Sequence, residues 1–388
     1  MTENTSAAKP ASQTPFKQKF SAFARRWFID AFTGMAQGLF VTLIAGTIFI
    51  QFGKLIGEQT GVGAIMILIG KIAGTLMGAG IGVGMAKYLK APNLVIFGCA
   101  VAGLAGAFLP DLAFTALAKG EFSLLGVAGS MQSLKLGAPG NPIGAYIGAV
   151  VAVAVAEKIY GKTKLDIIVI PLTILITCFV SMFLAIPAIW LISLVSRFIE
   201  ISTAAVPFIM GIVISVTMGL ILTLPTSSAA IWVALASGVT TDTMLLAGGA
   251  AVVGCACHMV GFAVMSFREN RWGGLISQGL GTSMLQIPNL MRNPKILIPP
   301  VVASAVCGPL ATTVFMLRCN ASGGGMGTSG LVGVFGVLDV TAGVIPAWQM
   351  WLGIILLMFV LPAIISWAVA LLLRKIGWIK ENDLKLDL

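Results

Sequence analysis

Side chains suited to binding a polar solute gather in one stretch, residues 279–330. Gln286 and Asn289 stand on either side of an Ile-Pro break, while Asn320 and Thr328 flank a GGGMG run. Neutral amides and hydroxyls donate and accept hydrogen bonds without the cost of burying a charge, so they suit the hydroxyl groups of a sugar-like molecule. The pattern predicts a solute-binding site in which the two amides make the main contacts.

Other polar residues have two interpretations each. The glycines between Asn320 and Thr328 either let the backbone approach a ligand or only permit a tight turn. Asn141, which follows Gly-Ala-Pro-Gly, is either a helix N-cap or a solute contact. Thr226 and Ser227 follow a proline and are expected to cap the next helix, whose N-terminus also directs N–H groups towards polar ligands. We keep all five as candidate binding residues.

His258 is the only histidine, and it lies inside an apolar run. An ionisable group at membrane depth is a functional candidate, although hydrogen-bonded packing between helices is the other interpretation. Cys255 and Cys257 lie beside it, but no second ligand pair follows at zinc-site spacing, so we predict no metal. The six cysteines all fall in or beside apolar runs, which favours free thiols. No catalytic residue and no cofactor is predicted.

The candidate residues lie on interrupted, polar segments. Two patches broken by glycine and proline, Gly279 to Pro294 and Leu317 to Gly330, flank an apolar segment of about 20 residues, roughly the length that crosses a bilayer. Irregular backbone at membrane depth is tolerated only where protein buries it or where it lines a watery cavity. Interrupted segments of this kind build the substrate site in many transporters, so we expect the site between the two patches.

Composition places these segments in a membrane. The chain is 58% hydrophobic and 10% charged, with a mean hydropathy of +1.00. Long Leu/Ile/Val/Ala/Gly runs without alternation exclude a β-barrel and predict an all-α polytopic membrane protein. The net charge of +10 comes from the termini and short loops, where it acts as a topology signal and not as a nucleic-acid surface. We predict no nucleic-acid partner.

Basic segments predict the orientation. In residues 1–28, aromatic side chains repeat at helical spacing between lysines and arginines, which indicates an amphipathic helix on anionic membrane lipids. Basic turns follow the second and fourth spans, and residues 375–388 form a short basic tail. We therefore expect both termini in the cytoplasm and residues 29–374 as the transmembrane domain.

About ten transmembrane helices and two re-entrant hairpins fit the hydropathy pattern. The hairpins are placed at Gly274 to Pro288 and at Gly323 to Val340. Arg318 and Asp339 are charges near opposite ends of the second hairpin. Because an unpaired charge at mid-membrane costs about 2.5–3.5 kcal/mol on insertion scales, they either pair or lie at interfaces.

Several motifs resemble a known family. GAPGNPIGAYIGA, GKTKLDIIVIPLTILI, GLGTSMLQIPNL and IPPVVASAVCGPLATTVFMLRCNASGGG occur in an order similar to the membrane component, IIC, of bacterial phosphotransferase-system sugar transporters. The resemblance is nearest to the fructose-like branch, and within it to small toxin-regulator-like, perfringolysin-regulator-like proteins. It implies a multi-pass protein of the bacterial inner membrane, a homodimer, a sugar site enclosed by re-entrant hairpins, and an elevator-like movement.

The chain differs from that family at the residues that would bind the sugar and support its phosphorylation. The resemblance places a sugar-binding glutamate just before Ile287, where this chain has Met284. The family's later histidine is also absent near Arg318, and no phosphocarrier domain (IIA or IIB) is expected on either short terminus. We therefore predict a IIC-type transporter uncoupled from phosphorylation. The alternatives are a solute-sensing membrane regulator without transport, and a phosphotransferase permease that uses separate phosphocarrier proteins.

Overall fold

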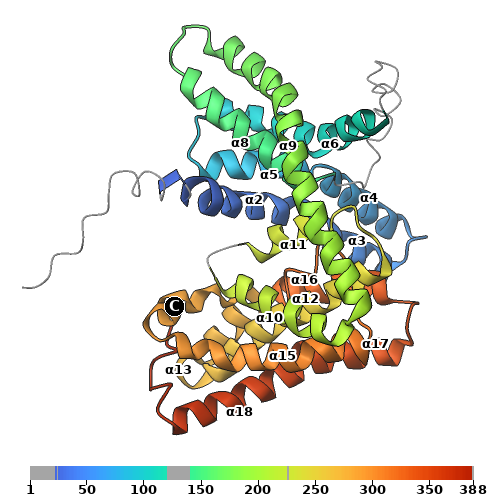
Figure 1. Cartoon of the computed structure of the whole chain (residues 1–388), viewed down its shortest axis with the longest axis vertical. Helices are drawn as coiled ribbons and strands as arrows, with labels where there is room; N and C mark the ends of the chain where they lie inside the picture. Colours follow the sequence, from blue (N-terminus) through green and yellow to red (C-terminus); the bar gives the residue numbers. More distant parts are fainter. Residues whose placement is uncertain (1–21, 24, 120–139, 225–226, 387–388) are drawn as a thin grey trace, which may run out of the picture.

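The computed structural model describes residues 22–23, 25–119, 140–224 and 227–386, and in these ranges every regular element is a helix. The predicted all-α class is therefore confirmed for the described residues. Two lobes are joined by one long helix (Figure 1). The N-terminal lobe comprises residues 25–119 and 140–159, and the C-terminal lobe comprises residues 207–224 and 242–386. Most of the predicted amphipathic arm lies outside the described residues.

The N-terminal lobe is packed through small residues. An added Cβ at Gly38 would lie 2.1 Å from the carbonyl oxygen of Gly80, and one at Gly82 would lie 1.9 Å from that of Cys99. Such close backbone approach is what small-residue faces provide between helices in lipid. The elements are η1 (Arg25–Asp30), α2 (Ala31–Leu39), η2 (Phe40–Ile44), α3 (Ala45–Ile56), α4 (Gly61–Thr75), α5 (Met77–Tyr88), α6 (Asn93–Lys119) and α8 (Pro142–Ile159).

Helix α9 (Asp166–Ala205) connects the lobes and is 40 residues long. At 1.5 Å per residue it spans about 60 Å, twice the thickness of the hydrocarbon core. It contacts α6 and α8 of the N-terminal lobe and α10 and α12 of the C-terminal lobe. The short helix α11 (Ser228–Ala236) lies between the lobes, where Ala230 and Val233 join the core of the N-terminal lobe.

The C-terminal lobe is built around α12 (Asp242–Met265), which is buried along most of its length. It packs against α10 (Pro207–Thr223), α15 (Ile298–Thr313) and α18 (Leu361–Lys375). Ser215 of α10 donates a 2.8 Å hydrogen bond to the carbonyl of Ser304 on α15. This contact satisfies a hydroxyl that would be costly to leave unpaired inside an apolar bundle.

Two irregular segments of this lobe coincide with the predicted hairpins. The first segment comprises α13 (Phe267–Ile276), η4 (Ser277–Gly281), η5 (Ser283–Gln286), α14 (Ile287–Arg292) and η6 (Pro294–Leu297). The second is a glycine-rich turn at residues 320–328, followed by η7 (Ser329–Leu331) and α16 (Val332–Thr341); α17 (Ala347–Ile355) and η8 (Leu356–Val360) then lead into α18. Broken backbone of this kind is the arrangement expected at a site inside a membrane protein.

The number of candidate spans is lower than the ten predicted. By length and composition, the described residues contain seven helices able to cross a membrane, or eight if α4 and α5, bent by 55°, form one span. Helix α9 is continuous from Asp166 to Ala205, so this apolar segment provides one long helix. Helix α10, with 17 residues, is shorter than a typical span.

The two charges near the second hairpin are both paired. Arg318, whose side chain is only 7% exposed, binds Asp242 through Nε at 2.5 Å and Nη2 at 2.9 Å. Asp339 accepts from Lys54 at 3.0 Å and from Gln51 at 2.6 Å, so this contact joins the two lobes. Of the two alternatives that the sequence left open, pairing therefore describes both charges.

Candidate functional site

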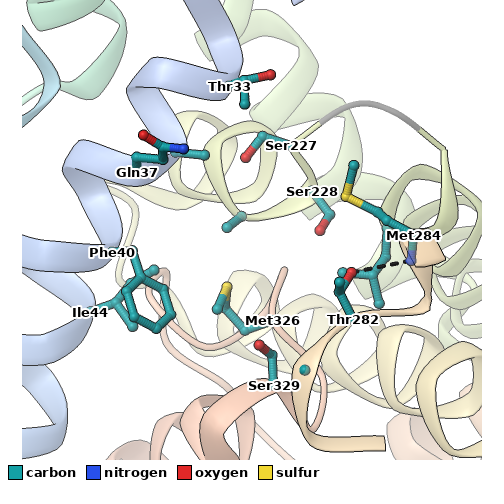
Figure 2. A pocket seen from close by; sticks show the side chains of 14 residues that line it. Thr33, Gln37, Phe40, Ile44, Ser227, Ser228, Thr282, Met284, Met326 and Ser329 are labelled. Carbon is teal, nitrogen blue, oxygen red and sulfur yellow. Dashed lines mark hydrogen bonds between the residues drawn. The ribbon is translucent and has the colours of Figure 1, made fainter. Parts of the chain in front are cut away.

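A cavity of about 390 Å³ lies where the two lobes and α11 meet. Figure 2 shows α2 and η2 on one side of it and the tips of the two irregular segments on the other. Its polar lining consists of hydroxyl and amide side chains, and its apolar lining of alanine, phenylalanine, isoleucine, leucine and methionine. The polar side chains are Thr33, Gln37, Ser227, Ser228, Thr282 and Ser329.

Helix α2 contributes Thr33 and Gln37, one turn apart and therefore on the same face. Gln37 is exposed and forms no hydrogen bond with any described residue. Its amide is thus available as both donor and acceptor at the cavity wall. Phe40 and Ile44, the next residues on this face, give the cavity an apolar border below the amide (Figure 2).

The start of α11 forms a second wall. Ser227 caps this helix by accepting a 3.1 Å hydrogen bond from the N–H of Ala230, and Ser228 donates a 2.7 Å bond to the carbonyl of Gly325. The second bond fixes the glycine-rich turn against α11. The predicted capping role of Ser227 is therefore present, and its hydroxyl also lines the cavity. Thr226 lies outside the described residues.

The tip of the first irregular segment forms the third wall with Gly281, Thr282 and Met284. Thr282 accepts a 3.2 Å hydrogen bond from the N–H of Met284, which closes the turn and presents both side chains to the cavity (Figure 2). Met284 thus places an apolar thioether at the cavity wall. A thioether is a weak acceptor and cannot transfer a proton.

His258 lies behind this wall and does not line the cavity. Its Nδ1 is 2.8 Å from the hydroxyl of Thr223, which is 3.0 Å from the hydroxyl of Ser283. All three side chains are fully buried, and Nε2 of His258 has no partner among the described residues. The geometry favours the packing interpretation of His258, with an indirect connection to the cavity through two hydroxyls.

Gln286 and Asn289, predicted as the main solute contacts, bind the C-terminal tail instead of facing this cavity. Gln286 is fully buried and donates to Gln278 at 2.8 Å and to the carbonyl of Leu384 at 3.1 Å. Asn289 donates to Gln286 at 2.9 Å and to the carbonyl of Lys385 at 2.8 Å. Because these bonds use their amide donors, the geometry does not favour direct solute contact.

The remaining candidates support the backbone. Asn141 caps α8 by accepting from the N–H groups of Ile143 and Gly144 at 3.0 and 3.1 Å, so the N-cap interpretation describes its contacts. Asn320 accepts from the N–H of Gly323 at 2.9 Å and donates to Asp339 at 3.1 Å.

Thr328, the last of them, joins the two irregular segments. Its hydroxyl donates a 2.6 Å hydrogen bond to the carbonyl of Gly279, so the glycine-rich turn is tied to η4. Thr328 and Asn320 therefore act on the cavity through the shape of the turn, whereas Met326 and Ser329 from the same turn line it.

Five of the polar lining residues were not predicted from the sequence, namely Thr33, Gln37, Ser228, Thr282 and Ser329. Thr33 and Gln37 were available as a signal, because two polar residues four positions apart in an apolar span lie on one helix face. Thr282 and Ser329 each belong to one of the singled-out patches, but their orientation depends on turns that spacing does not define.

The described lining of the cavity suits the binding of a polar molecule. Among the described residues that line it, none carries a carboxylate, imidazole, thiol, amine or guanidinium. Among the described residues no group of three or more histidines, cysteines or acids is arranged to hold a metal ion. Hydroxyls, amides and apolar surface together are the lining expected for a small neutral polar molecule.

Two helical lobes with a cavity between interrupted segments are an arrangement that many membrane transport proteins share. Within that class, residues 29–386 match the family described as Phosphotransferase system, EIIC. The chain belongs to this family, whose members are the membrane permease components of sugar transport systems, and the predicted resemblance is confirmed at this level. No curated protein and no solved structure matches the chain. Its placement in the fructose-like branch stays a prediction.

Proposed function

We propose that this chain is a IIC-type transporter that binds a small, neutral, sugar-like solute in the cavity between its lobes. The observation that carries the proposal is the lining of that cavity, whose described residues combine hydroxyls and one unpaired amide with apolar surface and include no charged side chain. A volume of about 390 Å³ lies within the range typical of small-molecule sites. A charged solute would lose its hydration there without gaining an opposite charge.

An elevator-like movement of the C-terminal lobe fits this geometry. Both irregular segments belong to that lobe, whereas Gln37 and Thr33 belong to the N-terminal lobe. A displacement of one lobe along the other would carry Thr282, Met284 and Ser329 with the solute and leave the α2 wall behind. Interfaces of packed helices are bistable and not continuously deformable, so such a movement connects two defined positions.

Transport uncoupled from phosphorylation is supported by Met284. In the family pattern this position holds a glutamate, and here a thioether lines the cavity in its place. Among the described lining residues, no carboxylate or imidazole is present to orient a reacting hydroxyl and accept its proton. The family match supports an alternative function, that of a phosphotransferase permease whose sugar is phosphorylated with the help of separate phosphocarrier proteins.

We further propose a homodimer in the bacterial cell membrane with both termini in the cytoplasm. Arg374 and Lys375 end the last helix, and Arg268 and Arg271 follow α12, so basic residues gather at the end of the lobe where the tail lies. Basic residues next to spans remain on the cytoplasmic side. A broad apolar surface on α9, including Phe179 and Phe198, is exposed to lipid or to a second copy.

The test is uptake into liposomes that contain only the purified chain. We expect a labelled neutral sugar or polyol from a screened panel to equilibrate across the membrane without any phosphocarrier. Ser329→Ala and Gln37→Leu should weaken binding of that solute, whereas Lys162→Met, in an exposed loop, should not.

Two other results of this experiment would each support one of the alternative functions. Saturable binding without flux would support the sensor and contradict transport. Accumulation of a phosphorylated sugar that depends on this chain and on added phosphocarriers would establish the permease and contradict uncoupled transport.

A further inference from the structure

A second cavity lies on the other side of Met284. It has a volume of about 320 Å³ and is lined by Met284, Leu285, Asn289, Arg292 and Lys385, among others. Met284 lines this cavity and also the solute cavity. The turn that carries Met284 therefore separates two hollows, one between the lobes and one beside the C-terminal tail.

The C-terminal tail forms the far wall of the second cavity. After α18 the chain turns at Gly377, with φ of +80°, and returns along the first irregular segment. Asn270 of α13 donates to the carbonyl of Leu384 at 2.7 Å and accepts from the N–H of Leu386 at 2.8 Å. This two-bond contact with the tail backbone resembles the pairing of an added strand and holds the tail in one register.

The tail is also bonded to the segment that carries Met284. Gln286 and Asn289 donate to the carbonyls of Leu384 and Lys385, and Asn289 also donates to the side-chain oxygen of Gln286. Gln286 lies two residues after Met284. The position of the Met284 turn is thus connected to the tail by a short chain of buried hydrogen bonds, and such networks hold one geometry when every member is satisfied.

Apolar contacts secure the same tail. Leu384 is fully buried and Ile379 nearly so, and both pack in one cluster with Phe262, Leu290 and Ile296. Leu290 follows Asn289 on α14, so the anchored tail and the first irregular segment share a core. Lys380 and Glu381, between the two anchors, are exposed.

We propose that the second cavity is a vestibule on the solute pathway, that Met284 is the gate between it and the solute cavity, and that the tail holds this gate closed through Gln286 and Asn289. The inference rests on the proposed transport function and deepens it. Methionine is unbranched and has three rotatable side-chain bonds, so it closes a gap and swings out of it with little strain. Polar side chains line the vestibule, which lets water reach the irregular turn from that side.

Gln286, Asn289 and Asn270 are positioning residues in this arrangement and do not touch the solute. Their different positions allow the role of the tail to be tested separately from that of the gate segment. Gln286 and Asn289 lie on the gate segment, whereas Asn270 binds the tail from α13 and makes no bond to η5 or α14. Releasing the tail at Asn270 therefore tests the tail alone, without altering the amides of the gate segment.

The experiment measures access to position 284 from the side of the tail. Met284→Cys is made in a background in which the six buried native cysteines are replaced, and is reacted with a membrane-impermeant, sulfonate-bearing methanethiosulfonate. Labelling rates are compared in inside-out and right-side-out membrane vesicles. Lys380→Cys, at an exposed tail position, identifies the side on which the tail lies. Asn270→Ala and Gln286→Leu are then each added to Met284→Cys, with Glu381→Gln as the matched control.

We expect the thiol at position 284 to react about fivefold faster from the tail side in both release variants, the effect of losing roughly one hydrogen bond of about 1 kcal/mol. Glu381→Gln should leave the rate unchanged. Equal rates in all variants would overturn the proposal, and so would an effect of Gln286→Leu without one of Asn270→Ala, because the tail would then not be the agent. If Gln286→Leu fails to fold, Asn289→Ala replaces it.

The labelling needs no solute, so it separates the gate from the proposed function. Failure of every sugar to bind the unmodified chain would contradict the transport proposal, while the labelling rates would still report on the gate. Where a solute binds, it should slow labelling of position 284 at least twofold when present at saturation. Unchanged labelling with solute bound would overturn the assignment of Met284 to the pathway.

Discussion

The proposed movement of the lobes predicts that the contact between Asp339 and α3 stabilises one of their two positions. Asp339 belongs to α16 of the C-terminal lobe, and its Oδ1 accepts from Gln51 at 2.6 Å and from Lys54 at 3.0 Å on the N-terminal lobe. A sliding movement of one lobe would break both bonds. We predict that Gln51→Leu combined with Lys54→Met depopulates the observed arrangement.

The size of the expected effect follows from the solvent exposure of the side chains that bind Asp339. The Lys54 side chain is 41% exposed and that of Asp339 26%, so their ion pair contributes only about 0.5 kcal/mol. The hydrogen bond from Gln51, which is 7% exposed, is made to a charged group and contributes about 1.5 kcal/mol. The sum of about 2 kcal/mol corresponds to a shift of about 30-fold in the equilibrium between the two lobe positions. Asn320 remains bonded to Asp339 in the variant, so the glycine-rich turn keeps its support.

The assay uses a second interlobe contact. The rings of Phe52 on α3 and Phe335 on α16 lie with centroids 5.4 Å apart. Phe52→Cys with Phe335→Cys should therefore be joined efficiently by a short bifunctional thiol reagent, and the joined fraction should fall steeply when Gln51 and Lys54 are also replaced. Lys162→Met, in an exposed loop, is the charge-matched control. An unchanged joined fraction would refute the reasoning, because the contact would then not bias the lobes.

Three further outcomes are expected. Ser329→Ala should weaken solute binding about 2- to 10-fold, the cost of one neutral hydrogen bond, as measured by titration calorimetry; wild-type affinity would move the site elsewhere. Asp242→Ala should lower the free energy of unfolding by about 1 kcal/mol, because the Asp242 side chain is 67% exposed and solvent screens its ion pair with the nearly buried Arg318; an unchanged melting temperature would contradict this. Asn141→Ala should cost about 1 kcal/mol of stability through the lost cap while leaving solute affinity unchanged, and a loss of affinity would restore Asn141 as a solute contact.

Local sequence signals predicted the fold class and the position of the irregular segments. The Gly-Ala-Pro-Gly-Asn-Pro string predicted a helix start, and Asn141 caps α8 there, because capping depends on three or four adjacent residues. Long apolar runs likewise predicted membrane helices, because the hydropathy of a span depends only on residues that follow one another in the sequence. By contrast, α9 continues through Pro187. Neighbouring residues in the sequence do not predict this, because a proline inside a membrane helix is tolerated through contacts with other helices in the tertiary structure.

The solute site was only partly predictable, because the hydrogen-bond partners of a polar side chain depend on the tertiary structure. Gln286 and Asn289 were predicted as the main solute contacts because they are polar residues in an apolar setting, but nothing in the pattern showed that their amides would donate to the backbone of residues 384–385. The converse holds for Gln37, which looks like an incidental residue of the first span. It faces the cavity only because α2 packs opposite α11 and the two irregular segments.

The neutrality of the cavity leads to a final prediction about pH and salt. No titratable side chain is among the described residues that line it, and His258, the only histidine, is separated from it by the hydroxyls of Thr223 and Ser283. Histidine is the one side chain whose ordinary titration falls between about pH 5 and 8. Affinity for a neutral sugar should therefore change less than about twofold over that range, and equally little between low and high salt, since screening acts only on charges. Strong weakening by salt would instead show that the solute is an ion and would refute the neutral-sugar assignment. A pH dependence that disappears in His258→Phe would show that the buried imidazole acts on the cavity through Thr223 and Ser283.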